Sequence, residues 1–368
     1  MSRKVDPRQY VFRPLSECPG FVLAKPIQQK GYEPEEVGKL ERENRLMITR
    51  KRDGWKLFVE KVNGKFKIYT DGINDITEKL PHIVTELKKL PIPNKTRLVG
   101  EGILELQQGA ARRDIRTVAA QIFQRNTQAA LDLQFEVGHI KFCFFDVIFW
   151  GGEYKLNLEY HIRYYAGGIA GLKLLYQTKR LAKNRGPINR KSERRRHEEE
   201  FRFVGDVEWV NTTLEEAKKM AVEKKWEGLV LYDKQFRSDF RLDGKAPQRI
   251  SGCYKWKPLQ EDDFIVRSWN PSETDPKRLK DVNISQIDPA TGKEFNCGKF
   301  GNFGKAMREQ LQTTTYPLVI QLEFESRYPS GKLQSASFME LREDKKPEFC
   351  VASESFSKAE LIRNCEDA

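Results

Sequence analysis

Residues 46–60 read LMITRKRDGWKLFVE, and this stretch sets the fold because strand-forming runs flank a short charged turn. Its aliphatic, β-branched and aromatic residues predict strands over 46–50 and 56–61. Between them, Asp53 and Gly54 are typical of a tight turn, which leaves Lys51 at a strand end beside basic neighbours. Nearby cations favour the deprotonated, nucleophilic form of a lysine amine. The stretch is therefore either a surface Asp-Gly hairpin or a segment that carries a nucleophilic lysine.

Other strand signals in the first two thirds of the chain are short β-branched or aromatic runs bounded by Gly, Asp or Pro. They lie at 66–70, 98–106, 140–150, 228–232 and 253–257. Helical patterns occupy 76–90, 113–132 and 213–225, and Thr213 is the expected cap of the last helix. This mixture predicts an α+β domain built on antiparallel sheets with helices.

From about Asp262 onward, helical patterns become rare. Strand-like runs at 263–268, 317–327 and 338–343 are separated by Gly, Asn and Pro turns. That pattern fits a small β-barrel of the OB-fold type. The sequence thus predicts two domains, at 1–259 and 260–368.

A strongly basic run, KRLAKNRGPINRKSERRR at 179–196, holds nine basic residues and one acid. It belongs to an expected insertion at about 179–206. Such runs are typical of solvated, mobile insertions. They are also typical of DNA-binding surfaces, because clustered Lys and Arg neutralise phosphates and release counterions. Both interpretations stay open.

The composition indicates a folded protein with an anionic partner. The 368 residues carry a net charge of +12, which favours nucleic acid, although a basic protein without that role remains an alternative. The six cysteines form no CxxC pair, so a zinc site or disulfide framework has little support. No run of about 18 apolar residues predicts a membrane span. The N-terminus lacks a secretion signal, so we expect an intracellular protein, in cytoplasm or nucleus.

Acids, lysines and an aromatic ring recur on the predicted strands. Glu101 lies in LVGEGIL, Glu227 opens EGLVLYD, and Phe145 in the strand at 140–150 offers a ring face for a purine. Lys255 and Lys257 alternate along CYKWKP, so both project from one face. Carboxylates can hold Mg²⁺ and ribose while lysines offset phosphate charge. Taken alone, each of these residues could have a purely structural role, in the core, at a strand edge or in a surface ion pair. Taken together, they suit the binding of a nucleoside triphosphate with Mg²⁺.

In this order the motifs resemble the covalent nucleotidyltransferase superfamily of ligases and mRNA capping enzymes, from FVLAKP (21–26) to REDKKPE (342–348). The resemblance implies an adenylyltransferase domain of ATP-grasp-like antiparallel sheets. It implies that Lys51 takes AMP, with Asp53 in the same catalytic motif and Thr49 near the adenine. The other implied roles are the ribose-contacting Glu101, the base-stacking Phe145, the intermediate-motif Arg163, the metal-associated Glu227 (with Glu101), and Lys255 and Lys257 at the α-phosphate.

The C-terminal segment, IQLEFESRYPSGKLQSASFMELREDKKPE, is similar to the closing OB segment of ATP-dependent DNA ligases, with Arg342, Asp344 and Lys345 matching their RxDK element. The resemblance implies that this domain closes over ATP and orients the pyrophosphate. A compact viral or phage-like enzyme is expected, monomeric, acting on nicked double-stranded DNA in repair, replication and recombination. An RNA ligase, a guanylyltransferase and a catalytically silent DNA-binding relative remain alternatives.

Three departures from the family pattern bear on DNA binding rather than on adenylation. Lys56, which the resemblance also places among the ATP-binding residues, stands where an arginine is usual after KxDG, and it lacks the planar fork for bidentate contacts. Thr70-Asp71 stands where the family has Ser-Arg, and Asp71 cannot bind a phosphate as arginine would. Gln334 and Ser337 replace arginines near the last barrel strand. DNA affinity and end preference are therefore the properties that the sequence leaves open.

Overall fold

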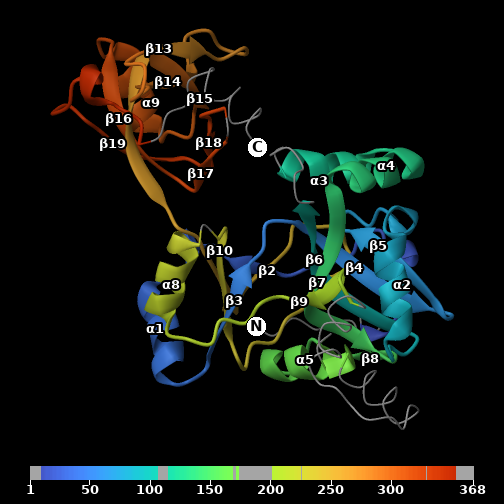
Figure 1. The fold of residues 1–368 in the computed structure, drawn as a ribbon. Coiled ribbons are helices and arrows are strands. Elements are labelled where there is room, and N and C mark those ends of the chain that lie inside the picture. The colour runs from blue at the N-terminus through green and yellow to red at the C-terminus, as the bar shows by residue number, and fades with distance from the viewer. Residues whose placement is uncertain are drawn as a thin grey trace. The chain divides into compact units, whose positions relative to one another are not determined.

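A computed structural model describes residues 10–106, 115–168, 171–173, 201–224, 226–328 and 330–353, in two compact units (Figure 1). Among these residues the first unit ends at Lys257 and the second begins at Pro258, two residues before the predicted boundary. The basic run at 179–196 lies outside the described residues. None of the helices in the described ranges is long and apolar enough to cross a membrane.

A four-stranded sheet in the first unit carries Lys51 of the KRDG segment. Its order is β2 (Lys25–Ile27), β12 (Arg249–Trp256), β10 (Gly228–Asp233) and β3 (Leu46–Lys51). Helices α1 (Pro34–Arg42) and α8 (Leu214–Glu223) cover one face of it, where Val37 and Ala217 pack with Ile48 and Leu231 (Figure 1). Thr213 caps α8 with a full capping box, as predicted.

A six-stranded sheet forms the rest of the first unit. Its order is β5 (Lys65–Thr70), β4 (Trp55–Val62), β6 (Thr96–Leu106), β7 (Gly138–Trp150) and β8 (Glu153–Tyr154), with β9 (Val204–Asp206) beside β7. Helices α2 (Pro81–Lys89), α3 (Ile115–Gln124) and α4 (Thr127–Val137) share its largest apolar core. α5 (Tyr160–Gly167) contributes two tyrosines to a second cluster that joins both sheets through Met47, Cys143 and Tyr232.

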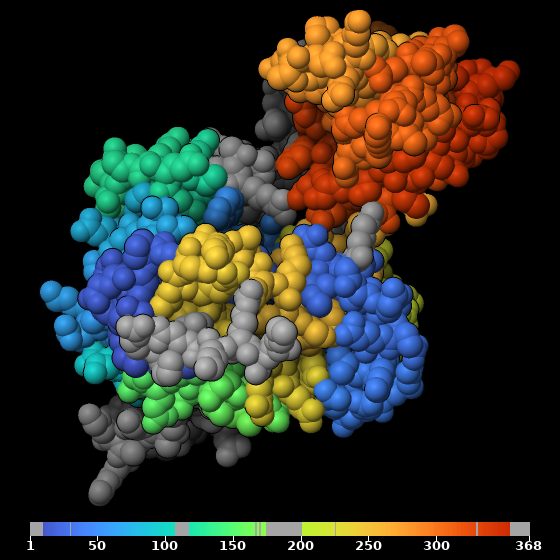
Figure 2. Space-filling view, turned by 180° about the vertical axis from the view of Figure 1, so that it is seen from behind, coloured from blue at the N-terminus to red at the C-terminus, as the bar shows by residue number. Residues whose placement is uncertain are grey.

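Short elements complete the first unit. β1 (Val22–Leu23) pairs with β11 (Phe240–Arg241), and the 3-10 turns are η2 (Leu15–Glu17), η3 (Gln29–Gly31) and η4 (Thr77–Lys79). In Figure 2, yellow segments near residue 240 lie among blue segments from near the N-terminus, as the β1–β11 and β2–β12 pairs require. The two sheets are built mainly from antiparallel pairs, and the β2–β12 and β7–β9 pairs are parallel.

The second unit is an antiparallel sheet of five strands with one helix. The strand order is β15 (Glu294–Phe300), β14 (Leu279–Ile287), β13 (Gln260–Pro271), β16 (Leu318–Phe324) and β19 (Ser337–Leu341). A small hairpin, β17 (Ser326–Arg327) and β18 (Leu333–Gln334), α9 (Lys305–Thr313) and the turn η5 (Pro347–Phe349) flank it. Within the described ranges β15 and β19 are not paired with each other, so no closed barrel is detected, and the OB-fold stays a prediction.

Two local predictions need correction. The hairpin alternative for LMITRKRDGWKLFVE is wrong, because β3 pairs with β10 and β4 pairs with β5 and β6 in a different sheet. The chain thus crosses from one sheet to the other between Lys51 and Trp55. The helix expected over 113–132 is two helices, because Asn126 caps a new helix by accepting from Ala129 N–H at 2.9 Å.

Candidate functional site

Lys51 is the last residue of β3 and lies directly beside the start of β10. It lies in register with Gly228, and its Nζ forms an ion pair with Glu227. Lys257 Nζ lies 3.1 Å from the other carboxylate oxygen of Glu227. The Lys51 and Glu227 side chains are only 14% and 13% exposed, so little water competes for the carboxylate. Two lysines far apart in sequence therefore converge on one acid.

Two glycines are needed for this close approach of the strands. A Cβ on Gly54 would lie 2.4 Å from the carbonyl oxygen of Gly102, so the KxDG turn can pass β6 only with glycine there. Gly228 has a φ of +151°, and a Cβ would lie 2.2 Å from the Trp256 carbonyl oxygen. Both positions lack space for a side chain and lie next to the ion-paired residues. The backbone spacing of the site is thus fixed by steric limits.

Glu101 and Lys255 are partly buried ionisable groups that interact electrostatically with this ion pair. Burial raises the pKa of Glu101 to about 7, although Lys51 and two other lysines oppose the shift. Burial, aided by the charge of Lys51, lowers the pKa of Lys255 to about 8. Both groups therefore titrate near neutral pH. Glu227 behaves differently: burial opposes its ionisation, but Lys51 and Lys257 outweigh burial and lower its pKa.

The pKa of Glu101 predicts a pH-dependent stability. Between about pH 4.5 and 7 the unfolded carboxyl has lost its proton while the folded one keeps it, so the free energy of unfolding should fall as pH rises through this window. Above pH 7 both states are ionised and the slope ends. Glu101→Gln should remove this part of the slope, as measured by urea unfolding at pH 5, 6, 7 and 8. An identical slope in the variant and the parent protein would contradict the pKa shift.

Lys56 connects this site to an outer charged cluster. It is the register partner of Glu101 on the neighbouring strand, and its Nζ lies 3.1 Å from Asp71 Oδ1. Lys25 Nζ lies 3.5 Å from Asp71 Oδ2. The acid that replaces the family's usual arginine therefore holds two lysines together at the edge of the site. Lys25 was not among the predicted site residues, although it lies in the FVLAKP segment that the sequence had already marked.

The remaining predicted residues of the first unit lie at different depths. Thr49 is 1% exposed, and its hydroxyl donates to the Val230 carbonyl oxygen at 3.4 Å. Phe145 lies within β7 and is partly buried between two apolar clusters. Asp53 is exposed in the crossing segment that follows Lys51. The structure thus groups Lys51, Glu101, Glu227, Lys255 and Lys257.

Arg163 lies in the core rather than beside these residues. Its guanidinium makes two hydrogen bonds to Asp146, at 2.7 and 3.0 Å, and donates to the carbonyl oxygens of Leu156, Leu158 and Phe236. The residue is 1% exposed. Through these hydrogen bonds the guanidinium links α5 to β7 and to the segments that contain Leu156, Leu158 and Phe236. The structure therefore does not bring Arg163 to the candidate site. No sequence pattern around Asp146 indicates that it pairs with Arg163.

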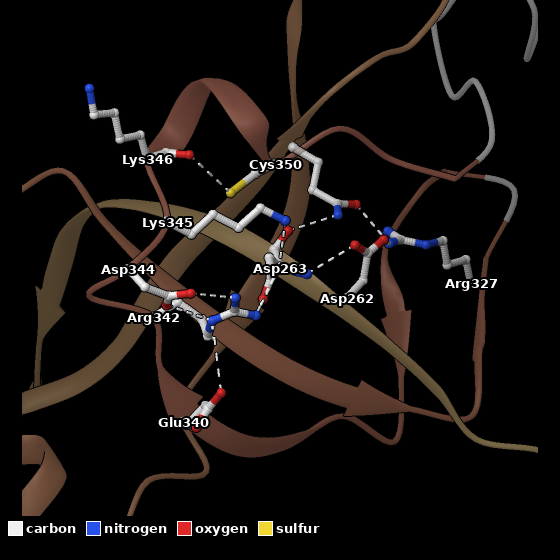
Figure 3. Close-up of polar contacts among 10 residues, drawn as sticks. Asp262, Asp263, Arg327, Glu340, Arg342, Asp344, Lys345, Lys346 and Cys350 are labelled. Atoms are coloured by element: carbon white, nitrogen blue, oxygen red, sulfur yellow. Dashed lines mark hydrogen bonds and ion pairs between the residues drawn. The ribbon is translucent and has the colours of Figure 1, made fainter.

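The RxDK residues form a cluster of their own in the second unit (Figure 3). Arg342 donates to both oxygens of Asp344 at 2.8 Å, and this pairing lowers the pKa of Asp344 to about 2. The buried Asp263 accepts from Arg342 at 3.2 Å and from Lys345 at 2.6 Å. Asp263 is thus the anchor of the motif, and sequence reasoning missed it because one acid of an Asp-Asp pair on a strand has no distinctive pattern.

Glu101 and Glu227 are the carboxylates of this group of residues that could contribute to holding Mg²⁺. Within the described ranges no three His, Cys, Asp or Glu side chains gather around one point. Mg²⁺ is commonly held by one or two carboxylates together with substrate phosphates. Glu101 and Glu227 supply such oxygens beside the lysines. They would hold the ion with a bound triphosphate.

Comparison with known proteins gives consistent matches. Residues 23–250 match the family model described as ATP dependent DNA ligase domain. The chain is similar to a Lig E DNA ligase from a study of DNA binding with a minimal scaffold, at 15% identity and a TM-score of 0.55, over 87% of this chain and 99% of that one. A chain described as Pmar-Lig_PreS3 is similar at 16% identity and a TM-score of 0.56, over 87% and 67% respectively.

A further similar structure is an ATP-dependent DNA ligase from bacteriophage T7 in complex with ATP, at 13% identity and a TM-score of 0.44, over 86% of this chain and 98% of that one. A search of curated proteins finds no match. At identities this low, the likeness to solved structures is a likeness of fold. The match to the family model covers more than half of the chain, including β3, β6, β7 and β10.

Proposed function

The chain belongs to the ATP-dependent DNA ligase family, and from that premise we propose that it seals nicks in duplex DNA through an adenylate on Lys51. The observation that supports the proposal is the convergence of Lys51 and Lys257 on Glu227, with the partly buried Glu101 and Lys255 close enough to interact electrostatically with Lys51. A lysine amine attacks phosphorus as the free base, and neighbouring cations or removal from water are the usual ways in which a protein makes that form available. Lys255 and Lys257 would offset the charge that develops on the phosphate oxygens.

The proposed reaction has three steps, and each exchanges one bond to a phosphate. The Lys51 amine attacks the α-phosphorus of ATP, a P–N bond forms, and pyrophosphate leaves. The 5′-phosphate of the DNA then displaces Lys51 from the AMP. Finally the 3′-hydroxyl at the nick attacks the activated 5′-phosphate and AMP leaves. In each step the chain's own residues align the attacking and leaving groups and neutralise charge. Mg²⁺, when bound by Glu101 and Glu227 with the phosphates, would add further charge neutralisation.

Glu227 has a specific part in the first step. Its carboxylate holds the Lys51 ammonium in the resting protein, and Lys257 remains its second partner at 3.1 Å. Once the Lys51 amine bears AMP it no longer carries a positive charge, so that ion pair is lost. The carboxylate, still paired with Lys257, would then also bind the ion that accompanies the phosphates. Glu227 therefore couples the state of Lys51 to the binding of the cation.

The experiment that tests the proposal is incubation of the protein with α-labelled ATP or GTP and Mg²⁺, followed by denaturing electrophoresis. A labelled band with ATP alone is expected. Sealing is then measured on matched DNA and RNA nicks, and the DNA nick is expected to be sealed faster. A band with GTP would indicate capping chemistry, and faster sealing of RNA would replace the DNA proposal. A folded protein with no adduct would support the silent DNA-binding alternative.

A further inference from the structure

Two neighbouring acids on the middle strand of the second unit, β13, bind different cations (Figure 3). Asp263 accepts from Arg342 at 3.2 Å and from Lys345 at 2.6 Å. Asp262 accepts from Arg327 at 3.0 Å. Successive residues of a strand project to opposite faces of the sheet. The strand therefore directs one carboxylate toward the RxDK residues and the other toward a separate arginine.

The pair of Asp262 with Arg327 belongs to the packing of the sheet. The Arg327 side chain is only 6% exposed, and its guanidinium lies 5.2 and 4.7 Å from the ring centroids of Phe264 and Phe324. Both rings are part of the apolar core of the second unit. Arg327 also donates to Gln286 at 2.7 Å. Asp262 thus balances the charge of an arginine that serves the fold.

The guanidinium of Arg342 is held on two edges by acids that differ in burial. Its Nη1 donates to both oxygens of Asp263, at 3.2 and 3.3 Å, and Asp263 is buried. Its Nε and Nη2 donate to Asp344, whose side chain is 69% exposed. Exposed ion pairs contribute little and are screened by salt, and a guanidinium fork pairs bidentately with phosphate as it does with carboxylate. An arriving phosphate can therefore replace Asp344 on this fork while Asp263 keeps its hold.

Lys345 is held by the same buried carboxylate, through a contact that uses one of its three ammonium donors. Long cationic side chains carry a large rotamer entropy, and immobilising them weakens the binding of a ligand. A group that fixes them before the ligand arrives removes part of this cost. Asp263 does this for two cations of the RxDK element at once.

We infer that Asp263 is a positioning residue that presets Arg342 and Lys345 for the pyrophosphate of the adenylation step. The inference rests on the proposed function and on the pyrophosphate contact that the family resemblance implies for these two cations. Pyrophosphate leaves in the first step of the proposed reaction. It takes no part in the last step, in which the 3′-hydroxyl attacks the adenylated 5′-phosphate. Loss of the Asp263 carboxylate should therefore weaken the first step and its reversal, and spare the last step.

The test is the reversal of the first step, measured with the full chain. A pyrophosphate oxygen attacks the phosphorus of the isolated Lys51 adduct, the P–N bond breaks, ATP forms and the lysine amine recovers a proton. Asp263→Asn should raise the KM for pyrophosphate, measured with Mg²⁺, by roughly 10- to 100-fold, the cost that is usual for residues that orient metal ligands. Sealing of a nick that already carries a 5′-adenylate should proceed at the rate of the parent protein.

Asp262→Asn is the matched control, because it removes the same charge from the adjacent residue and from a buried arginine pair. It should leave the KM for pyrophosphate unchanged. Asp263→Glu, which keeps the charge but displaces the carboxylate, should give an intermediate KM, and it replaces Asp263→Asn if that variant does not fold. An unchanged KM in the Asp263 variants, an equal rise in the Asp262 variant, or an equal loss of sealing would overturn the inference. A parent protein that forms no adduct would instead refute the ligase proposal on which the inference rests.

Discussion

Lys51→Ala is expected to abolish the covalent adduct with labelled ATP, a loss of roughly 10⁴-fold or more, as for other enzymes that lose their nucleophile. The fold should survive, because Glu227 keeps Lys257 as a partner at 3.1 Å and Gly228 keeps its place in the β3–β10 register. Sealing of a nick that already carries a 5′-adenylate should be retained in part, because that last step does not use the lysine as nucleophile. Electrophoresis of the adduct and sealing of pre-adenylated DNA measure the two effects separately.

A matched control is Lys65→Ala, which removes an exposed lysine from β5 in the same unit. Its adduct formation should equal that of the parent protein. An adduct that persists in Lys51→Ala at the parent level would show that another residue takes the nucleotide. The ligase mechanism would then need a different nucleophile, and the Glu227 ion pair would be structural.

Arg163→Met is expected to lower the free energy of unfolding by roughly 3–5 kcal/mol, the usual cost of leaving one partner of a buried ion pair uncompensated. Asp146 would lose its ion-pair partner in the core, and the carbonyl oxygens of Leu156, Leu158 and Phe236 would lose their donor. The double variant Arg163→Met with Asp146→Leu should recover part of this loss, because it removes the stranded charge. Urea unfolding followed by tryptophan fluorescence measures both.

The same variants decide between two roles for Arg163. A core role predicts reduced stability with little change in the KM for ATP at temperatures where the variant is folded. The nucleotide contact implied by the family resemblance predicts the reverse, a raised KM with stability preserved. Arg163→Lys is a useful intermediate, since it retains the charge but can make fewer hydrogen bonds than the five donors of a guanidinium allow.

The sequence by itself determined the elements and the chemical character of the site. Alternation, β-branched runs and caps predicted β3, β4, β10 and α8 close to their observed bounds. KxDG, EGL and KWK strings marked the lysines and acids that the structure groups, because each string lies at a strand end where its side chain and its backbone are both constrained. The family assignment also came from these strings in order, and the match over residues 23–250 confirms it.

The tertiary structure alone decided which residues meet. No local pattern indicates that β3 and β4 lie in different sheets, because sheet pairing depends on partners far along the chain, such as β10 for β3. Likewise, Arg163 and Asp146 are 17 residues apart, and only the packing of α5 against β7 shows that their charges cancel in the core. Asp71 and Asp263 gain their lysine and arginine partners in the same way. Burial and pairing depend on distance in space, and sequence patterns report mainly on distance along the chain.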